Sequence, residues 1–221
     1  MKKILLLVEG FTEERFVNEI LQPYFDCACF LTPVLVRTRC DDTGHAHKGG
    51  YVTYALFKKQ ILNLLRDSSA AMVTTMVDYH ALASDFPGKE TARNLRPLKQ
   101  AVDHIEQQVS EDIRDKRFLP YLSCPQIEAL LFADVEVLRS RLSALCPKLG
   151  SGLSLPSVAD PEEINAQNPP AKLLSDACPN FVKSEHTIEI AKEMGLEVIL
   201  QRCAHFRLWV EKLRTVCESD S

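Results

Sequence analysis

The chain has 221 residues, a length typical of one large domain or of one domain with an appendage. Its hydrophobic fraction of 46% and charged fraction of 25% exclude the disordered and fibrous classes. A formal net charge of −4 argues against a surface that binds nucleic acid throughout, so a polyanion would have to be held by a local basic patch.

The N-terminal apolar run is too short for a signal peptide or a membrane span, because it ends at Glu9. We therefore expect a cytoplasmic protein with no membrane contact. The eight cysteines contain no CxxC pair, which argues against a zinc site. In a reducing compartment, buried free thiols are the expected state.

Residues 4–8 are five consecutive apolar residues, which predicts a strand covered on both faces. A helix over residues 13–22 should follow, with Glu13 at the head of its buried stripe. In open α/β sheets, ligands bind beyond the carboxyl ends of the strands. Glu9 and Glu13 are therefore candidate site residues, and a surface helix with a turn glutamate is the alternative.

Residue types mark both ends of this helix. Gly10 allows the backbone to turn after the strand, and Thr12 is the predicted N-cap. Pro23 should end the helix.

The next segments alternate between strand and helix. Residues 33–37 and 72–77 are predicted strands, and residues 53–66 have the apolar spacing of a packing helix. Right-handed crossovers between parallel strands would then place Asp78 at the same edge of the sheet as Glu9.

A polar loop over residues 40–50 separates the second strand from the packing helix. It contains Asp41, Asp42 and an H-x-H pair, His45 and His47. No matching ligand spacing follows, so solvated polar sequence is the favoured interpretation over a metal site. Gly49-Gly50 suggests a hinge or a close backbone approach before the helix.

Carboxylates from two strand ends supply the hard oxygen ligands that a divalent cation such as Mg²⁺ requires. Glu9 and Asp78 are the two candidates, and the alternative for Asp78 is a cap of the following turn. A loop with Asp85 comes next, followed by a predicted helix over residues 91–109. Arg93, Arg96 and Lys99 on its first turns either hold phosphates or form a solvated face.

Residues 117–122 are a candidate fourth strand, and Pro125 suits the first turn of another helix. Glu128 precedes an unbroken apolar segment, where a charge is costly unless it is paired or bound to metal. Asp134 is the predicted N-cap of the next helix.

The domain organisation follows from a shift in composition. Residues 1–142 form the α/β domain, residues 143–170 are linker-like, and residues 171–221 form a helical segment packed on the main domain. In that segment, Ser184 should cap a helix that stops at Gly195, and residues 196–216 should form a second amphipathic helix. His186 and His205 are interpreted as packing or capping residues.

An ordered series of motifs carries a resemblance over nearly the whole chain. The motifs are V-E-G-x-T-E-E-x-F at 8–16, G-G at 49–50, T-T-M-V-D-Y at 74–79, D-F-P-G at 85–88, R-F-x-P-Y at 117–121, E-A-L-L-F-A-D at 128–134 and H…G-L…C-A-H-F…W from 186 to 209. They resemble the bacterial family DUF4276, which is similar to the Toprim-like group of topoisomerases, primases and overcoming-lysogenization-defect (OLD) nucleases.

The resemblance implies a Toprim-like, Rossmannoid parallel sheet and a phosphodiester role. Some members of the family work beside an ATPase of the ABC or OLD type, as in phage defence. By position, Glu9 is the Toprim glutamate and Asp78 the acidic end of the later strand. Position 80 is His where D-x-D has its second acid, so Glu13, Asp85 or Glu128 would supply the missing carboxylate.

The leading hypothesis is therefore a Mg²⁺- or Mn²⁺-dependent nuclease or nuclease subunit, with Glu9, Glu13, Asp78 and Glu128 as metal ligands. If His80 is a ligand, the preference shifts toward Mn²⁺. One alternative is a catalytically silent Toprim-like module that binds a partner ATPase or a nucleotide. Another is phosphoryl transfer on a small nucleotide.

Overall fold

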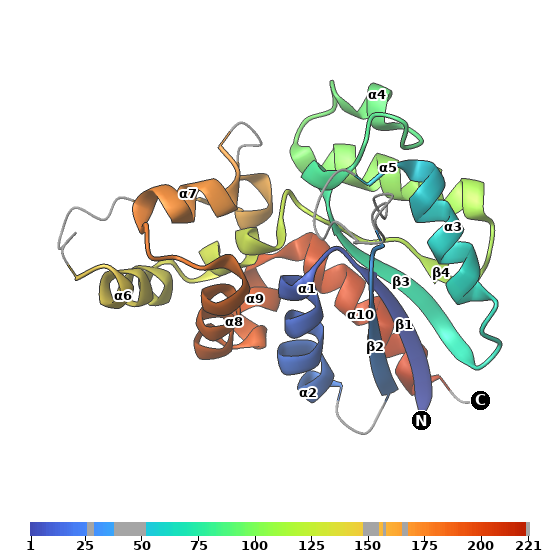
Figure 1. Cartoon of the computed structure of the whole chain (residues 1–221), viewed down its shortest axis with the longest axis horizontal. Helices are drawn as coiled ribbons and strands as arrows, with labels where there is room; N and C mark the ends of the chain where they lie inside the picture. Colours follow the sequence, from blue (N-terminus) through green and yellow to red (C-terminus); the bar gives the residue numbers. More distant parts are fainter. Residues whose placement is uncertain (26–28, 38–51, 148–154, 157, 165–167, 220–221) are drawn as a thin grey trace, which may run out of the picture.

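A parallel β-sheet forms the centre of the molecule (Figure 1). The computed structural model describes residues 1–219 except 26–28, 38–51, 148–154, 157 and 165–167. The strand order is β2-β1-β3-β4, and β5 continues the pairing with β3, every pair being parallel. The strands are β1 (Lys2–Val8), β2 (Cys29–Leu35), β3 (Ala70–Asp78), β4 (Phe118–Leu119) and β5 (Leu122–Ser123). The predicted α/β class with a parallel sheet flanked by helices is confirmed.

The sheet is buried on both faces, as its uninterrupted apolar strands predict. Along β1, Ile4 and Leu6 belong to one hydrophobic cluster, whereas Leu5 and Leu7 belong to another on the opposite face. The alternation follows from the period of two residues in a strand. The central strands are therefore enclosed by core on both sides.

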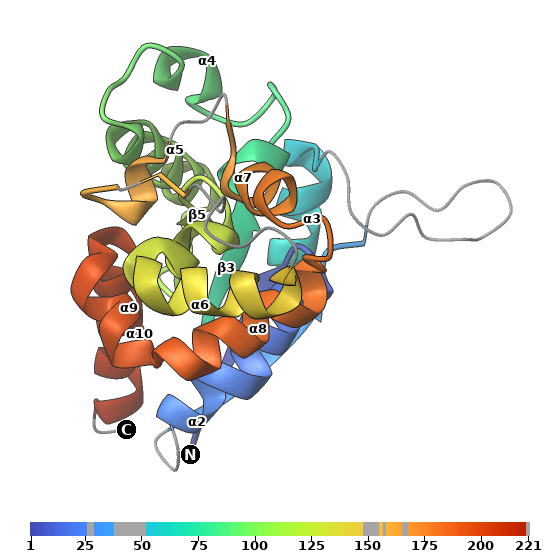
Figure 2. The ribbon, with the colours of Figure 1, turned by 90° about the vertical axis from the view of Figure 1, so that its left-hand side faces the viewer.

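Helices cover the two faces unequally (Figures 1 and 2). One face packs on α3 (Tyr54–Leu65) and α5 (Leu98–Ile113). The other packs on α1 (Phe11–Phe16), the π-helical turn η1 (Val17–Leu21), α2 (Gln22–Tyr24), α8 (Lys183–Met194), α9 (Leu196–Arg202) and α10 (Ala204–Glu218). Helices α6 (Val135–Leu145) and α7 (Pro170–Ala177) lie beyond the end of the sheet in Figure 1.

The C-terminal helices share a core with the strands. The indole of Trp209 on α10 donates a hydrogen bond of 2.9 Å to Thr74 Oγ1 on β3, and both residues are buried. The rings of Phe206 and Phe16 meet edge to face with centroids 6.0 Å apart. The last helix therefore completes one face of the sheet.

The first helical segment differs from its prediction. Thr12 is not the N-cap; the helix begins after Gly10, which is extended at φ −157°. A Cβ at Gly10 would lie 3.4 Å from Glu13 Oε2, so the glycine's small size leaves room for that carboxylate. The segment continues through a π-helical turn into α2, so Pro23 lies inside the helical segment and does not end it as predicted.

Prolines divide two elements that the sequence analysis treated as continuous. The predicted helix over 91–109 is wrong as a single element: α4 (Lys89–Ala92) ends early, and α5 starts after Pro97. The predicted strand over 117–122 becomes β4 and β5, separated at Pro120. Proline has no N–H for a ladder or an interior helical turn, so both breaks have a common cause.

The later helices also show one confirmed cap and three corrections. Asp134 accepts hydrogen bonds from the amides of Glu136 and Val137, as predicted. The segment after Pro125 is the 3-10 helix η3 (Ile127–Ala133). Ser184 is not a cap, because α8 already starts at Lys183. The helix ends before Gly195, as predicted. The segment 196–216 is divided into α9 and α10 at Cys203.

Four cysteines are paired, contrary to the expectation of free thiols. Cys29 is bonded to Cys217, and Cys146 to Cys178. Each pair joins cysteines that the fold brings together from distant segments, so their spacing in sequence gave no indication. Cys124 and Cys203 are free and buried. Among the described residues, no helix is long and apolar enough to cross a membrane.

Candidate functional site

Two carboxylates meet where the central strands end, as their positions in the sequence predict. Glu9 follows β1 directly, and Asp78 is the last residue of β3. Glu9 Oε2 accepts a 3.0 Å hydrogen bond from the backbone N–H of Asp78. The parallel pairing of β1 with β3 therefore fixes one carboxylate against the strand end that carries the other.

Two further glutamates and a lysine complete this acidic site. Glu13 comes from α1, Glu128 from η3 and Lys183 from the start of α8. The ammonium nitrogen of Lys183 lies 3.0 Å from Glu128 Oε1, 3.5 Å from Asp78 Oδ2 and 3.9 Å from Glu13 Oε1. One cation therefore faces three carboxylates at once.

The hydrogen bonds of the acidic site are incomplete. Asp78 Oδ1 accepts the N–H of Ile127 at 3.0 Å, which fixes η3 against the strand end. Glu13 Oε1 and both oxygens of Glu128 are buried and receive no well-aligned hydrogen bond from a described residue, so the Lys183 ammonium, 3.0 Å from Glu128 Oε1, is the cation that faces them. Burying an ionised carboxylate without hydrogen bonds costs free energy, so additional positive charge or bound protons would stabilise this site.

Burial and mutual repulsion change the proton affinity of these groups. Burial raises the pKa of Glu9 and Glu128 to about 7, and the charge of Asp78 adds to both shifts. The pKa of Glu13 rises to about 8 for the same two reasons. Burial also raises the pKa of Asp78, against the opposing effect of Lys183. The surrounding carboxylates raise the pKa of Lys183, which stays charged.

The site opens to solvent on one side. A cavity of about 400 Å³ is bounded by Glu9, Gly10, Thr12, Glu13, Lys183 and Ser184, together with neighbouring residues of α1 and α8. The side chain of Lys183 is 38% exposed, whereas those of Asp78 and Glu128 are 3% and 0% exposed. A ligand of moderate size can therefore reach Glu9, Glu13 and Lys183 from the cavity, with the other two carboxylates behind them.

The acidic site offers carboxylate oxygen alone, the ligand type that a hard divalent cation prefers. With all four carboxylates ionised and Lys183 charged, the site holds an excess of three negative charges. Oxygen atoms without hydrogen-bond donors are what Mg²⁺ or Mn²⁺ binds. Glu9, Glu13, Asp78 and Glu128 are the residues that would hold such an ion.

The remaining predicted acid and histidine have different places: His80 is close enough to Asp78 for the two to affect each other's pKa, whereas Asp85 serves another element. His80 lies two residues after Asp78, with its Nε2 buried and without a hydrogen-bond partner among described residues. Asp85 accepts the N–H of Tyr54 with both oxygens and so serves the start of α3. Of the three proposed replacements for the second acid of D-x-D, Glu13 and Glu128 are at the site and Asp85 is not.

The predicted basic residues also lie apart from the carboxylates. Arg93 and Arg96 are exposed between α4 and α5, and neither has an ion-pair partner among the described residues. Arg96 donates to the carbonyls of Arg93 and Leu95. Lys99 is paired with Asp103. The polar loop over 40–50, with its H-x-H pair, lies outside the described residues.

Sequence reasoning missed Lys183. It stands 105 positions after Asp78, in a segment (Val182-Lys183-Ser184-Glu185) that has the composition of a solvated helix start. The unpaired acid at Glu128 was the available signal, because a buried charge requires a partner. In the same segment, His186 Nδ1 accepts the N–H of Val182, the capping role predicted for it.

Comparisons with known proteins place the chain in a family. Neither a search of curated proteins nor a search of solved structures found a match. A family model described as a domain of unknown function, DUF4276, matches residues 8–214. Since the match spans nearly the whole chain, including every residue of the acidic site, the protein belongs to the DUF4276 family.

Proposed function

We propose that this protein is a divalent-metal-dependent hydrolase of phosphodiesters, with the acidic site as its catalytic centre. The observation that carries the proposal is the gathering of four acids, Glu9, Glu13, Asp78 and Glu128, at one strand end, with a single lysine paired to the last three. Three of their buried oxygens receive no well-aligned hydrogen bond from a described residue, and Lys183 is the cation that faces them. When the carboxyl groups are ionised, one lysine does not balance their charge, and a divalent cation would.

Each residue has a definable task in this proposal. Asp78 and Glu128 lie deepest and would anchor Mg²⁺ or Mn²⁺, which supplies charge stabilisation at phosphate and a bound water of lowered pKa. Glu9 and Glu13 line the cavity, where either can orient an attacking water. Lys183 reaches the same cavity and can offer its positive charge to a phosphate oxygen.

Arg93 and Arg96 support a polymeric substrate. Both are exposed and free of ion pairs among described residues, in the segment that follows the Asp78 strand end. Guanidinium groups of this kind contact phosphates without reading sequence. We propose DNA or RNA as the substrate, with a partner ATPase in a bacterial phage-defence setting as the wider context that the Toprim-like resemblance implies.

Calorimetric titration with Mn²⁺ and Mg²⁺ tests the site. We expect binding by the unaltered protein, with affinity at least about tenfold weaker in Asp78→Asn and Glu128→Gln, which remove charge at constant shape. Asn at position 78 keeps the acceptor for Ile127 N–H. Asp85→Asn is the matched control, because this predicted acid lies outside the site. No binding at millimolar metal, or equal affinities in all variants, would contradict the proposal.

Cleavage assays then identify the substrate. With Mn²⁺ present, DNA, RNA and bis(p-nitrophenyl) phosphate separate a nuclease from an enzyme of small phosphodiesters. We expect the double variant Arg93→Ala/Arg96→Ala to cleave DNA or RNA more slowly and with a weaker dependence on salt. Its cleavage of bis(p-nitrophenyl) phosphate should be unchanged. Loss of both activities to the same degree would remove the arginines' proposed role.

A second candidate function rests on Lys183 itself. Its ammonium lies within 3.9 Å of three carboxylates and could stand permanently where a metal would bind. His80 at the place of the second D-x-D acid points the same way. The protein would then be a silent module that binds a nucleotide or a partner ATPase. In that case Lys183→Gln should create metal affinity that the unaltered protein lacks.

A further inference from the structure

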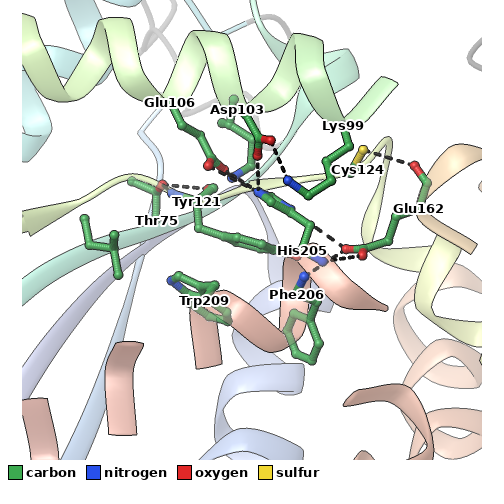
Figure 3. Close-up of polar contacts among 12 residues, drawn as sticks. Thr75, Lys99, Asp103, Glu106, Tyr121, Cys124, Glu162, His205, Phe206 and Trp209 are labelled. Atoms are coloured by element: carbon green, nitrogen blue, oxygen red, sulfur yellow. Dashed lines mark hydrogen bonds and ion pairs between the residues drawn. The ribbon is translucent and has the colours of Figure 1, made fainter. Parts of the chain in front are cut away.

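A second cluster of ionisable side chains lies near β4, an outer strand of the sheet, between α5 and the start of α10 (Figure 3). Asp103 and Glu106 stand one turn apart on α5, and His205 is the second residue of α10. One donor atom from each of the three lies within 4.8 Å of the others. The proposed hydrolytic centre uses none of these residues.

The spacing of the donor atoms suits a metal ion. His205 Nε2 lies 3.1 Å from Glu106 Oε1 and 3.8 Å from Asp103 Oδ1. Donors placed about 2.1 Å from one ion lie roughly 3–3.5 Å apart in tetrahedral or octahedral coordination. Little movement is needed for the three to share an ion. An adjacent cavity of about 70 Å³, lined by the same side chains, has room for water in the remaining positions.

The imidazole is held in one orientation. It stacks on Tyr121 with centroids 5.0 Å apart, and Tyr121 stacks on Trp209 at 4.3 Å. His205 is 6% exposed. This stack, visible in Figure 3, fixes the plane of the ring, in which Nε2 faces Asp103 and Glu106 and Nδ1 faces Glu162.

The hydrogen bonds of His205 leave room for a further proton or a metal ion, because Nε2 meets Glu106 Oε2 at 3.2 Å and Nδ1 has no hydrogen-bond partner among the described residues. Nδ1 is buried without a hydrogen bond and lies 3.8 Å from Glu162 Oε1. Either neutral tautomer leaves one ring lone pair facing carboxylate oxygen, since carboxylates lie at both nitrogens. Two states resolve this: a doubly protonated ring, or a metal on Nε2 with Nδ1–H directed at Glu162. The second is the usual arrangement of histidine ligands, in which a carboxylate orients the ring from behind.

The carboxylates are already fixed in place. Glu162 accepts the backbone N–H groups of His205 at 2.7 Å and Phe206 at 3.0 Å, so it stays beside the ring. Glu106 Oε1 accepts the N–H of Leu122 at 2.8 Å. Lys99 pairs with Asp103 Oδ2 at 2.5 Å, and Lys212 also lines the cavity, so two cations compete with an ion there.

We propose that Asp103, Glu106 and His205 form a second metal site, one that takes a borderline divalent cation of the Zn²⁺ or Mn²⁺ type through one nitrogen and two oxygen donors. It differs in kind from the acidic site, which offers oxygen alone.

Zn²⁺ titration of the full chain against a chelator of known affinity tests the site. We expect Asp103→Asn to weaken binding at least about tenfold, as losing one ligand does. Its side chain is 45% exposed, so the variant should fold. Lys99→Met should act in the opposite direction and tighten binding several-fold, since it removes a competing charge from Asp103. Glu128→Gln at the acidic site and His45→Ala/His47→Ala in the polar loop are controls that should leave this affinity unchanged.

Imidazole ¹H–¹⁵N spectra distinguish the two states of His205. With Zn²⁺ bound, Nδ1 should carry the proton and Nε2 should lose its own. A ring that stays doubly protonated with zinc present would show that the cluster is a buried ion pair only and would overturn the proposal. Zinc affinity indifferent to both Asp103→Asn and Lys99→Met would do the same. Neither result depends on hydrolysis, so failure here leaves the acidic site's function untouched.

Discussion

The acidic site and the cluster around His205 differ in how many of their carboxylates are paired or hydrogen-bonded. At the acidic site, three carboxylates share Lys183, a fourth lies at the adjacent strand end, and buried oxygens of Glu13 and Glu128 receive no well-aligned hydrogen bond from a described residue. Around His205, by contrast, backbone amides or a lysine hold every carboxylate. Only one ring nitrogen of that second cluster lacks a partner. The stability of the first cluster should therefore depend strongly on pH, and that of the second mainly on its fixed contacts.

The largest expected effect is a fall in stability with rising pH in the metal-free protein. Glu9, Glu13 and Glu128 have native pKa values of about 7, 8 and 7, against 4.5 for the free side chain. Between these limits the native state binds more protons than the unfolded state, so stability is retained below about pH 4.5 and lost through pH 7–8. Urea unfolding with EDTA at pH 5 and pH 8 should differ by at least about 2 kcal/mol.

Two comparisons sharpen that measurement. Adding Mn²⁺ at pH 8 should restore the lost stability, because the ion binds the ionised native site. Glu128→Gln should flatten the profile, since it removes one of the titrating groups. A metal-free protein equally stable at both pH values would show that the acidic site carries no unmet charge.

Removing the lysine should have the next largest effect. In Lys183→Met the three carboxylates around its ammonium lose their cation, and we expect a loss of about 1–3 kcal/mol at pH 8 without metal. Lys192→Met is the matched control on the same helix: Lys192 is 49% exposed and pairs with Glu19, so its loss should cost less than about 1 kcal/mol. Equal losses in urea unfolding would mean that Lys183 contributes no more than a surface ion pair.

The sequence predicted one side of the acidic site because local patterns define it. Apolar runs identify β1 and β3, and parallel strands end at one edge, so Glu9 and Asp78 had to be neighbours. Glu13 followed from helical periodicity, and the cost of burying Glu128 predicted that it has a partner. Each of these inferences needed only a few adjacent residues.

The rest depends on contacts between distant segments. Lys183 and His205 reach their clusters through the packing of the last helices on the sheet, which no local pattern encodes. The breaks at Pro97 and Pro120 are a different kind of miss, since both prolines were visible and interrupt helix or strand by a known mechanism. A stricter use of proline would have corrected these two elements but would not have found Lys183.

The smallest expected effect tests the fixed contacts of the second cluster. Glu162 and Glu163 are adjacent, and each accepts two backbone amides at the start of a helix, Glu162 at α10 and Glu163 at α5. Glu162 is 2% exposed, whereas water can reach Glu163. Glu162→Gln turns one acceptor into a donor against a buried amide, so it should cost about 1–2 kcal/mol, and Glu163→Gln about half as much. If Glu162→Gln and Glu163→Gln lose the same unfolding free energy, then burial does not strengthen the contacts of Glu162. The two clusters would then differ only in their charge.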